Sequence, residues 1–257
     1  MAFKLPTFFT TFAIFDWIII LLCLICALVV HFVPFPDSFE PHIKNDVNNT
    51  VLEDNIPYYF TFMIILIPGL LAVIGLALFV QKSISALYAV TAYLFSITFA
   101  LLIATVIKTI MGRPRPDTQQ LCGDYNKCKE ELSVQTLSFQ FRSFPSSHAA
   151  ETMAAGVFVS LFLCDVWESG TMVSTFFVLM PTFFSIFTSL LRIATHKTHI
   201  DDVLLGFFIG GTVAYLSYQS YKRKIQEEQE IIKRLNDSTS SESSIISNPG
   251  QPLKKYC

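Results

Sequence analysis

The chain has 257 residues, of which 52% are apolar, 14% aromatic and only 15% charged, and its formal net charge is −2. Soluble domains carry about 25% charged residues, so a soluble protein of this composition would lack polar helix faces. A near-neutral balance without a basic patch also argues against nucleic-acid binding. Most charges lie within residues 34–57, 112–143 and 222–257, so the apolar stretches between these segments predict a membrane protein.

Six apolar segments are long enough to cross a hydrocarbon core of about 30 Å, which needs about 20 residues per helix. In chain order they are Phe12–Val33, Tyr58–Val80, Ser83–Ile110, Ser147–Cys164, Met172–Ile193 and Val203–Tyr221. Bulky residues rather than a small-residue cleavage site follow the first segment, which is therefore a retained helix and not a signal peptide. The fold class predicted is all-α, a bundle of six transmembrane helices.

Both chain ends are expected on one side of the membrane, because the number of spans is even. The basic cluster Lys222–Lys224 after the last span favours the cytoplasm for that side. We therefore expect a cytoplasmic N-terminus over residues 1–11, a membrane domain over 12–221, and a cytoplasmic, largely disordered tail over 222–257 with at most a short surface helix. Asp16 is expected at the cytoplasmic interface without a catalytic role.

The loops on the other side would face the exterior or the lumen of an endomembrane compartment. The first of them contains Asn48, a glycosylation acceptor that is usable only there. A later loop on this side carries Arg113 and Arg115 among several cations, against the positive-inside tendency, so these cations need another reason to exist. Cys122 and Cys128 share that loop and could pair in an oxidising compartment.

Three polar clusters lie at the ends of the apolar spans, where ionisable residues are costly and by default mark a functional site. They are Lys108–Asp117 after the third span, Phe144–Glu151 at the start of the fourth, and Leu191–Val203 between the fifth and sixth. Span counting alone places all three on the outer face. We therefore expect one site at the extracytoplasmic helix ends.

The chemistry of these clusters indicates phosphate binding. Lys108, Arg115 and Arg192 can surround a phosphoryl group, because planar guanidinium groups match its oxygens. Ser146 is expected to cap the fourth span, which would leave the amides of Ser147 and the next residue pointing at the anion. Taken singly, the cations could be snorkelling boundary residues and the serine an ordinary helix cap.

Histidines supply the groups that titrate near neutrality. His148, His196 and His199 are suited to proton transfer or to attack on phosphorus, and Asp202 can hold a nearby imidazole in one tautomer. A metal site in the histidine-rich hairpin is the alternative, but the hairpin lacks thiols and closely grouped carboxylates.

The first two clusters resemble signature motifs of the type 2 phosphatidic-acid phosphatase family, also called lipid phosphate phosphatases. The first family motif is Lys, six residues, then Arg-Pro, and it matches Lys108, Arg115 and Pro116 in full. The second is Pro-Ser-Gly-His, and Pro145–His148 matches it with Ser147 in place of glycine.

The third family motif is Ser-Arg, five residues, His, three residues, Asp. Arg192 and Asp202 match it in register, whereas Leu191 replaces the serine. Strict spacing places the family's nucleophilic histidine at Thr198, and His199 is the next residue. The likeness extends from about residue 12 to residue 221, including the first outer loop.

The resemblance implies a metal-independent, cofactor-free mechanism in which one histidine attacks phosphorus and His148 protonates the leaving alkoxide. It implies as substrate a phospholipid in the bilayer: phosphatidate or a related lipid phosphate such as diacylglycerol pyrophosphate, lysophosphatidate or a sphingoid-base phosphate. Asp202 could still orient His199, because offsets of three and four share a helix face. Alternatively Thr198 attacks, or the protein is a catalytically impaired pseudophosphatase that binds lipid phosphates.

Glu151 follows His148 by three residues, on the same helix face, within an apolar span. A carboxylate there should face the bundle interior, so we expect Glu151 to contact the site from within the bundle. A transporter is a third class of function, but paired Gly or Pro interruptions in corresponding halves are not evident.

Overall fold

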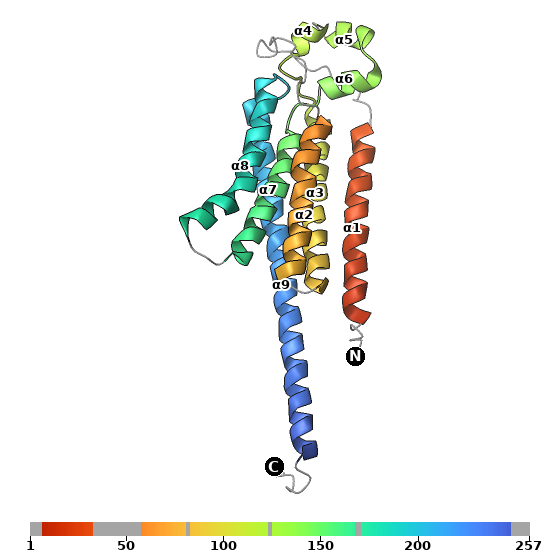
Figure 1. Cartoon of the computed structure of the whole chain (residues 1–257). Coiled ribbons are helices and arrows are strands. Elements are labelled where there is room, and N and C mark those ends of the chain that lie inside the picture. The colour runs from red at the N-terminus through yellow and green to blue at the C-terminus, as the bar shows by residue number, and fades with distance from the viewer. Residues whose placement is uncertain (1–6, 33–57, 81–82, 123–124, 168–170, 248–257) are drawn as a thin grey trace.

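The structure is a computed structural model that describes residues 7–32, 58–80, 83–122, 125–167 and 171–247. All secondary structure in these residues is helical (Figure 1). The long helices are α1 (Thr7–Phe32), α2 (Tyr58–Val80), α3 (Ser83–Met111), α7 (Ser147–Val166), α8 (Met172–Ala194) and α9 (Ile200–Ser247). Five of them are long and apolar enough to cross a membrane, and α2 contains a shorter apolar segment, Ile65–Leu78. The expected all-α membrane bundle is confirmed.

Helix α7 occupies the centre of the bundle, where it packs against α2, α3, α8 and α9. Its contact with α9 is close because glycines of α9 face it. A Cβ added at Gly210 would lie 2.2 Å from the carbonyl oxygen of Ala150, and one at Gly206 would lie 2.7 Å from that of Ser146. Small residues let membrane helices approach in this way. The close approach fixes the start of α9 beside the start of α7.

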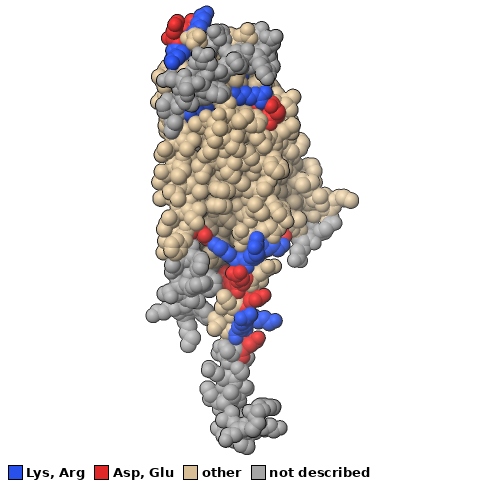
Figure 2. All heavy atoms as spheres, turned by 180° about the vertical axis from the view of Figure 1, so that it is seen from behind, with Lys and Arg blue, Asp and Glu red and all other residues tan. Residues whose placement is uncertain are grey.

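The outer surface of the bundle is apolar along its middle. Large apolar side chains of α1 and α8 are exposed, among them Leu22, Phe32, Met172 and Phe183. Figure 2 shows charged side chains gathered above and below a wide uncharged belt. In water such a belt would be unstable, whereas hydrocarbon solvates it, so the multi-pass membrane assignment follows from the surface as well as from helix length.

The segment between α3 and α7 forms a helical cap over one end of the bundle (Figure 1). It contains α4 (Thr118–Cys122), α5 (Tyr125–Glu131) and α6 (Val134–Gln140). Cys122 and Cys128 form a disulfide, and both are buried with Leu137 and Phe141 in a small core of their own. The sequence gives no helical periodicity here, because the three helices span only one or two turns each.

Helix α9 differs from the sequence prediction. At most a short surface helix is predicted after Tyr221, but α9 continues without a break to Ser247. Extending a formed helix avoids the cost of nucleation, and residues just beyond the membrane favour the helix. Ile225 packs against the main core, and Arg234 lies 3.9 Å from Glu230 one turn away. Asn48 and the rest of the first outer loop lie outside the described residues.

Candidate active site

The three polar clusters come together at the capped end of the bundle, where α3 ends and α7 and α9 begin. Lys108 in the last turn of α3 lies within electrostatic range of Arg115, Arg192, Glu151 and Asp202. Arg192, in the last turn of α8, and Lys108 both lie within electrostatic range of His148. The structure thus gathers residues from all three clusters around one point.

The start of α7 has the geometry of a capped helix. The Oγ atom of Ser146 accepts a hydrogen bond from the backbone amide of Ala149 at 3.3 Å, and Ser146 is the N-cap residue. The Nζ atom of Lys108 donates to Oγ of Ser147 at 3.0 Å. A cation therefore reaches a helix N-terminus, whose amides and dipole attract anions. His148, the second residue of α7, is buried.

Asp202 is the most heavily bonded carboxylate of the site and has no exposed surface. Its Oδ2 atom accepts hydrogen bonds from the backbone amide of His199 at 2.9 Å and from Oγ of Ser143. Its Oδ1 atom accepts a hydrogen bond from Arg113 at 2.8 Å. A buried carboxylate with an arginine and several hydrogen-bond donors remains charged, because these partners replace the water it has lost.

The imidazole ring of His199 is oriented by this carboxylate. Its Nδ1 atom lies 3.2 Å from Oδ2 of Asp202, and a carboxylate that is charged can only accept, so Nδ1 carries the hydrogen. Nε2 therefore holds the lone pair, and within the described residues this buried atom has no hydrogen-bond partner. The hydroxyl of Thr198, the neighbouring residue, is likewise buried without a partner there.

The turn before His199 explains how this histidine reaches Asp202 although it lies one residue beyond the position given by the family motif. Helix α8 ends in a Schellman motif: the amide of Lys197 donates to the carbonyl of Arg192, and that of His196 to the carbonyl of Ile193, each at 3.0 Å. His196 has φ of 56°, the left-handed conformation that such a motif requires. The motif reverses the chain at once, which leaves Thr198 and His199 free to reach the start of α9.

Two further predicted site residues, Glu151 and Pro116, are buried. Glu151 is only 2% exposed, so it faces the bundle interior rather than lipid. Pro116 is buried beneath the cap, where the backbone amide of the preceding Arg115 donates to the carbonyl of Gln140 at 3.0 Å. The cap therefore holds the backbone of the first motif in place.

Sequence reasoning missed several residues that join the clusters. Arg113 has no predicted role and Ser143 is not predicted at all, yet both bind Asp202. Lys197 of the third cluster forms an ion pair of 2.9 Å with Asp117 of the first, and both side chains are largely buried. For the charged residues the signal in the sequence is the excess of charge on the outer side, which does not assign partners, and Ser143 has no such signal.

Arg142 joins the cap to the first helix, since its NH1 atom donates to the carbonyl of His31 at 2.8 Å. Burial lowers the pKa of this guanidinium from its usual value, although arginine stays protonated at any physiological pH. In the described residues no group of three or more His, Cys, Asp or Glu side chains is arranged to hold a metal ion.

Comparison with known proteins finds several similar proteins. The chain is 27% identical over 226 residues to lipid phosphate phosphatase 2 of Arabidopsis thaliana, and the matched region covers 82% of this chain and 77% of the relative. It is 27% identical over 141 residues to the probable diacylglycerol pyrophosphate phosphatase 1 of Schizosaccharomyces pombe, 49% of this chain and 50% of the relative. It is 25% identical over 222 residues to probable lipid phosphate phosphatase 4 of Arabidopsis thaliana, 79% and 70% of the two chains.

No solved structure matches the chain. Residues 89–226, more than half of the sequence, match the PAP2 superfamily, and this region contains all three motifs together with α7, α8 and most of α3. The chain therefore belongs to the PAP2 superfamily, the type 2 phosphatidic-acid phosphatase family that its motifs resemble.

Proposed function

We propose that this protein hydrolyses a lipid phosphate in the membrane through a phosphohistidine formed on His199. The observation that carries the proposal is the His199–Asp202 pair, which directs the Nε2 lone pair away from the carboxylate. A nucleophile, a residue that orients it and nearby cations are the parts that covalent catalysis needs. The relatives named lipid phosphate phosphatases support a lipid phosphate as substrate.

The substrate's phosphoryl group binds among Lys108, Arg115 and Arg192, whose charges offset those of its oxygens. The backbone amides at the start of α7, at Ser147 and His148, bind it from the other side. The lipid's acyl chains remain in the bilayer beside the bundle. Phosphatidate is the leading candidate, and diacylglycerol pyrophosphate, lysophosphatidate and sphingoid-base phosphates offer the same terminal group.

In the first step Nε2 of His199 attacks phosphorus, and the bond between phosphorus and the lipid oxygen breaks. The oxygen takes a proton from His148 and leaves as the lipid alcohol. Asp202 stabilises the positive charge that develops on the ring of His199. In the second step water attacks the phosphohistidine, His148 accepts its proton, and inorganic phosphate and the free ring of His199 are released.

A second candidate function is binding of lipid phosphates without turnover. The observation that favours it is Thr198, which occupies the position that strict motif spacing gives to the nucleophile. Its hydroxyl makes no hydrogen bond to a base in the described residues, and an alcohol is a poor nucleophile without a base bonded to it.

The proposed orientation places the site outside the cytoplasm, with both chain ends inside. Lys222 pairs with Asp165 in the last turn of α7, so the cluster at Lys222–Lys224 lies at the end of the bundle opposite the cap. The disulfide between Cys122 and Cys128 supports an oxidising environment for the cap, since such bonds are rare in the cytosol.

Phosphate release from phosphatidate without magnesium tests these alternatives, with Thr198→Ala and His199→Ala compared with wild type. Loss of a covalent nucleophile costs on the order of 10⁶ in rate, so His199→Ala should abolish release whereas Thr198→Ala should retain it. No release from wild type would favour the binding protein. Release that survives His199→Ala but not Thr198→Ala would assign the attack to Thr198.

A further inference from the structure

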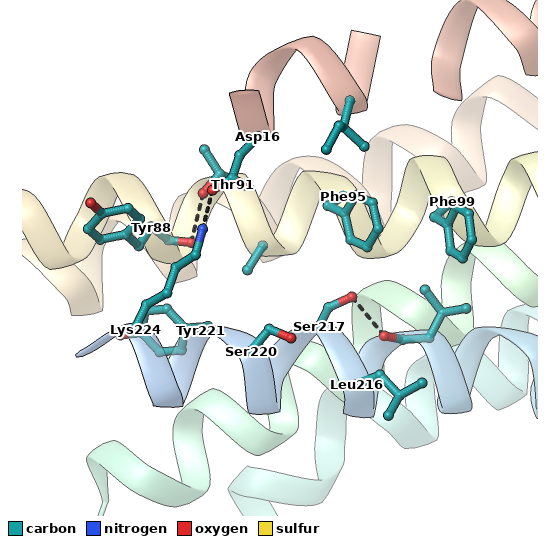
Figure 3. Close-up of a pocket in the computed structure, with 13 residues that line it drawn as sticks. Asp16, Tyr88, Thr91, Phe95, Phe99, Leu216, Ser217, Ser220, Tyr221 and Lys224 are labelled. Atoms are coloured by element: carbon teal, nitrogen blue, oxygen red, sulfur yellow. Dashed lines mark hydrogen bonds and ion pairs between the residues drawn. The ribbon is translucent and has the colours of Figure 1, made fainter. Parts of the chain in front are cut away.

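A cavity lies between α1, α3 and α9, away from the candidate phosphate site (Figure 3). Its volume of about 460 Å³ falls within the range of about 300–1,000 Å³ typical of small-molecule sites. The lining residues nearest the phosphate site are Phe99 on α3 and Val213 on α9. Phe99 precedes Lys108 by nine residues, which is about 14 Å along a helix. The cavity is therefore separate from the proposed active site.

The lining of this cavity changes from polar to apolar along its length (Figure 3). At one end Lys224 pairs with Asp16, close to the hydroxyl groups of Thr91 and Ser220. At the other end the walls are apolar and aromatic, formed by Ile19, Ala92, Phe95, Phe99, Val213 and Leu216. An amphiphile with a small polar head and a hydrocarbon chain has the same polarity gradient.

The dimensions of the cavity match one leaflet of a bilayer. Its polar end at Lys224 and its apolar end at Val213 are eleven residues apart on α9, or about 16 Å. Half of a hydrocarbon core of about 30 Å is about 15 Å. The walls open sideways, because Ile19 is 46% exposed and Leu216 is 55% exposed. A lipid can therefore enter from the leaflet opposite the phosphate site.

The charges at the polar end select the headgroup. Asp16 and Lys224 form one ion pair, so this end presents a carboxylate acceptor and an ammonium donor without net charge. A phosphate headgroup would lie against the carboxylate, and like charges in contact are costly. A free hydroxyl can instead donate to Asp16 while an ester carbonyl accepts from Lys224.

We propose that this cavity binds a neutral, hydroxyl-headed glycerolipid of the diacylglycerol class. The proposed hydrolysis releases a lipid of this class, but the assignment rests on the cavity alone and stands whether or not the protein is a phosphatase. The site makes the chain a receptor for a neutral lipid in one leaflet in addition to its phosphate site in the other.

Photocrosslinking of the full-length protein in lipid nanodiscs tests the proposal. The probe is diacylglycerol with a diazirine in one acyl chain, and the competitors are unlabelled diacylglycerol and a phosphonate analogue of phosphatidate that cannot be hydrolysed. We expect label on the α3 and α9 segments that line the cavity. Diacylglycerol should compete at least about tenfold better than the phosphonate.

Variants distinguish this cavity from the general lipid surface. Leu216→Trp should fill the cavity and remove the label, whereas Leu179→Trp on α8, where the leucine is also 55% exposed, should leave it unchanged. Asp16→Asn leaves Lys224 unpaired and should shift preference toward the anionic phosphonate. Label that Leu216→Trp does not reduce, or a wild type that prefers the phosphonate, would overturn the proposal.

Discussion

At the scale of single residues, Asp202 organises the candidate site, because several groups around the proposed nucleophile His199 bind to it. Its carboxylate accepts hydrogen bonds from Arg113, from Ser143, and from both the backbone amide and the ring of His199. Because it is fully buried, the loss of one partner leaves polar atoms unpaired in a place that water does not reach. Residues that never touch substrate therefore affect the rate.

Ser143→Ala should lower the rate constant for phosphate release by about 10- to 100-fold, because losing one buried hydrogen bond costs about 1–3 kcal/mol. The KM should change little, since the phosphate-binding cations are retained. Ser160→Ala is the matched control: Ser160 is also buried, but it bonds to Thr182 within the bundle. Equal effects of the two variants on the rate would contradict a positioning role for Ser143.

We expect His196 to have a structural role rather than a chemical one. Its left-handed backbone conformation costs about 1–2 kcal/mol for an ordinary residue, and asparagine tolerates it better. His196→Asn should keep activity within about twofold and leave thermal stability equal or higher, whereas the β-branched substitution His196→Val should lower both. Thermal unfolding and phosphate release measure the two effects. An inactive but stable His196→Asn would instead assign chemistry to His196.

The site residues divide clearly into those that sequence predicts and those that it does not. Motif spacing leads directly to Lys108, Arg192 and Asp202, because each occupies a fixed position relative to a helix end. The same spacing places the family's nucleophile at Thr198. The Schellman motif at the end of α8, which spacing does not reveal, explains how His199 reaches Asp202. Ser143 binds across a separation of 59 residues, and no local pattern encodes that contact.

At the scale of elements, the pairing of α7 with α9 determines the geometry of the site. The backbone amide of Ser146 donates to the carbonyl of Asp202 at 2.9 Å, so the helix that presents the anion-binding amides is bonded to the helix that carries the carboxylate. The close approach at Gly210 maintains this bond.

Gly210→Ala should destabilise the protein by about 1–3 kcal/mol, because the added methyl group meets the carbonyl of Ala150 in a packed interface. Activity should fall as well, since α9 must move away from α7. Gly211→Ala is the control, because nothing lies within 4 Å of a Cβ at that position. It should be neutral or slightly stabilising through its helix propensity. Similar losses in both variants would point to helix flexibility instead of close packing.

The length of the apolar segments predicts the long helices well, because a helix that crosses the hydrocarbon core must contain about 20 apolar residues. The ends of α2, α3, α7 and α8 differ from the predicted spans by no more than two residues. The cap helices are not predicted, since each is too short for periodicity and is held by the disulfide and by Phe141. The extension of α9 is not predicted, because the apolar segment ends at Tyr221 whereas the helix continues into the polar residues that follow.

At the scale of the whole molecule, we propose different functions for the two ends of the bundle. The capped end contains the candidate phosphate site, and the opposite end contains the cavity proposed for a neutral lipid and the extension of α9 (Figure 1). Helix α1 begins, and α9 leaves the bundle, at the end opposite the cap (Figure 1), which is why span counting along the sequence predicts a single site at the capped end.

This orientation predicts which end of the bundle membrane-impermeant thiol reagents can reach in intact cells. In a background without other free cysteines, Glu131→Cys on the cap should react from outside. Arg234→Cys on the extension of α9 should react only after the membrane is permeabilised. Both positions are exposed, with side chains 52% and 82% accessible, so access alone does not distinguish them. The reverse pattern of labelling would invert the topology.

The central claim is that His199 carries the phosphoryl group, and rapid-quench labelling tests it most directly. The wild-type protein is mixed with phosphatidate labelled at phosphorus, quenched within one turnover and mapped by mass spectrometry. We predict a phosphorylated His199 that forms before phosphate is released, is absent from His199→Ala and persists in His196→Asn. Label on Thr198, or phosphate released with no enzyme-bound label at any time, would contradict the account.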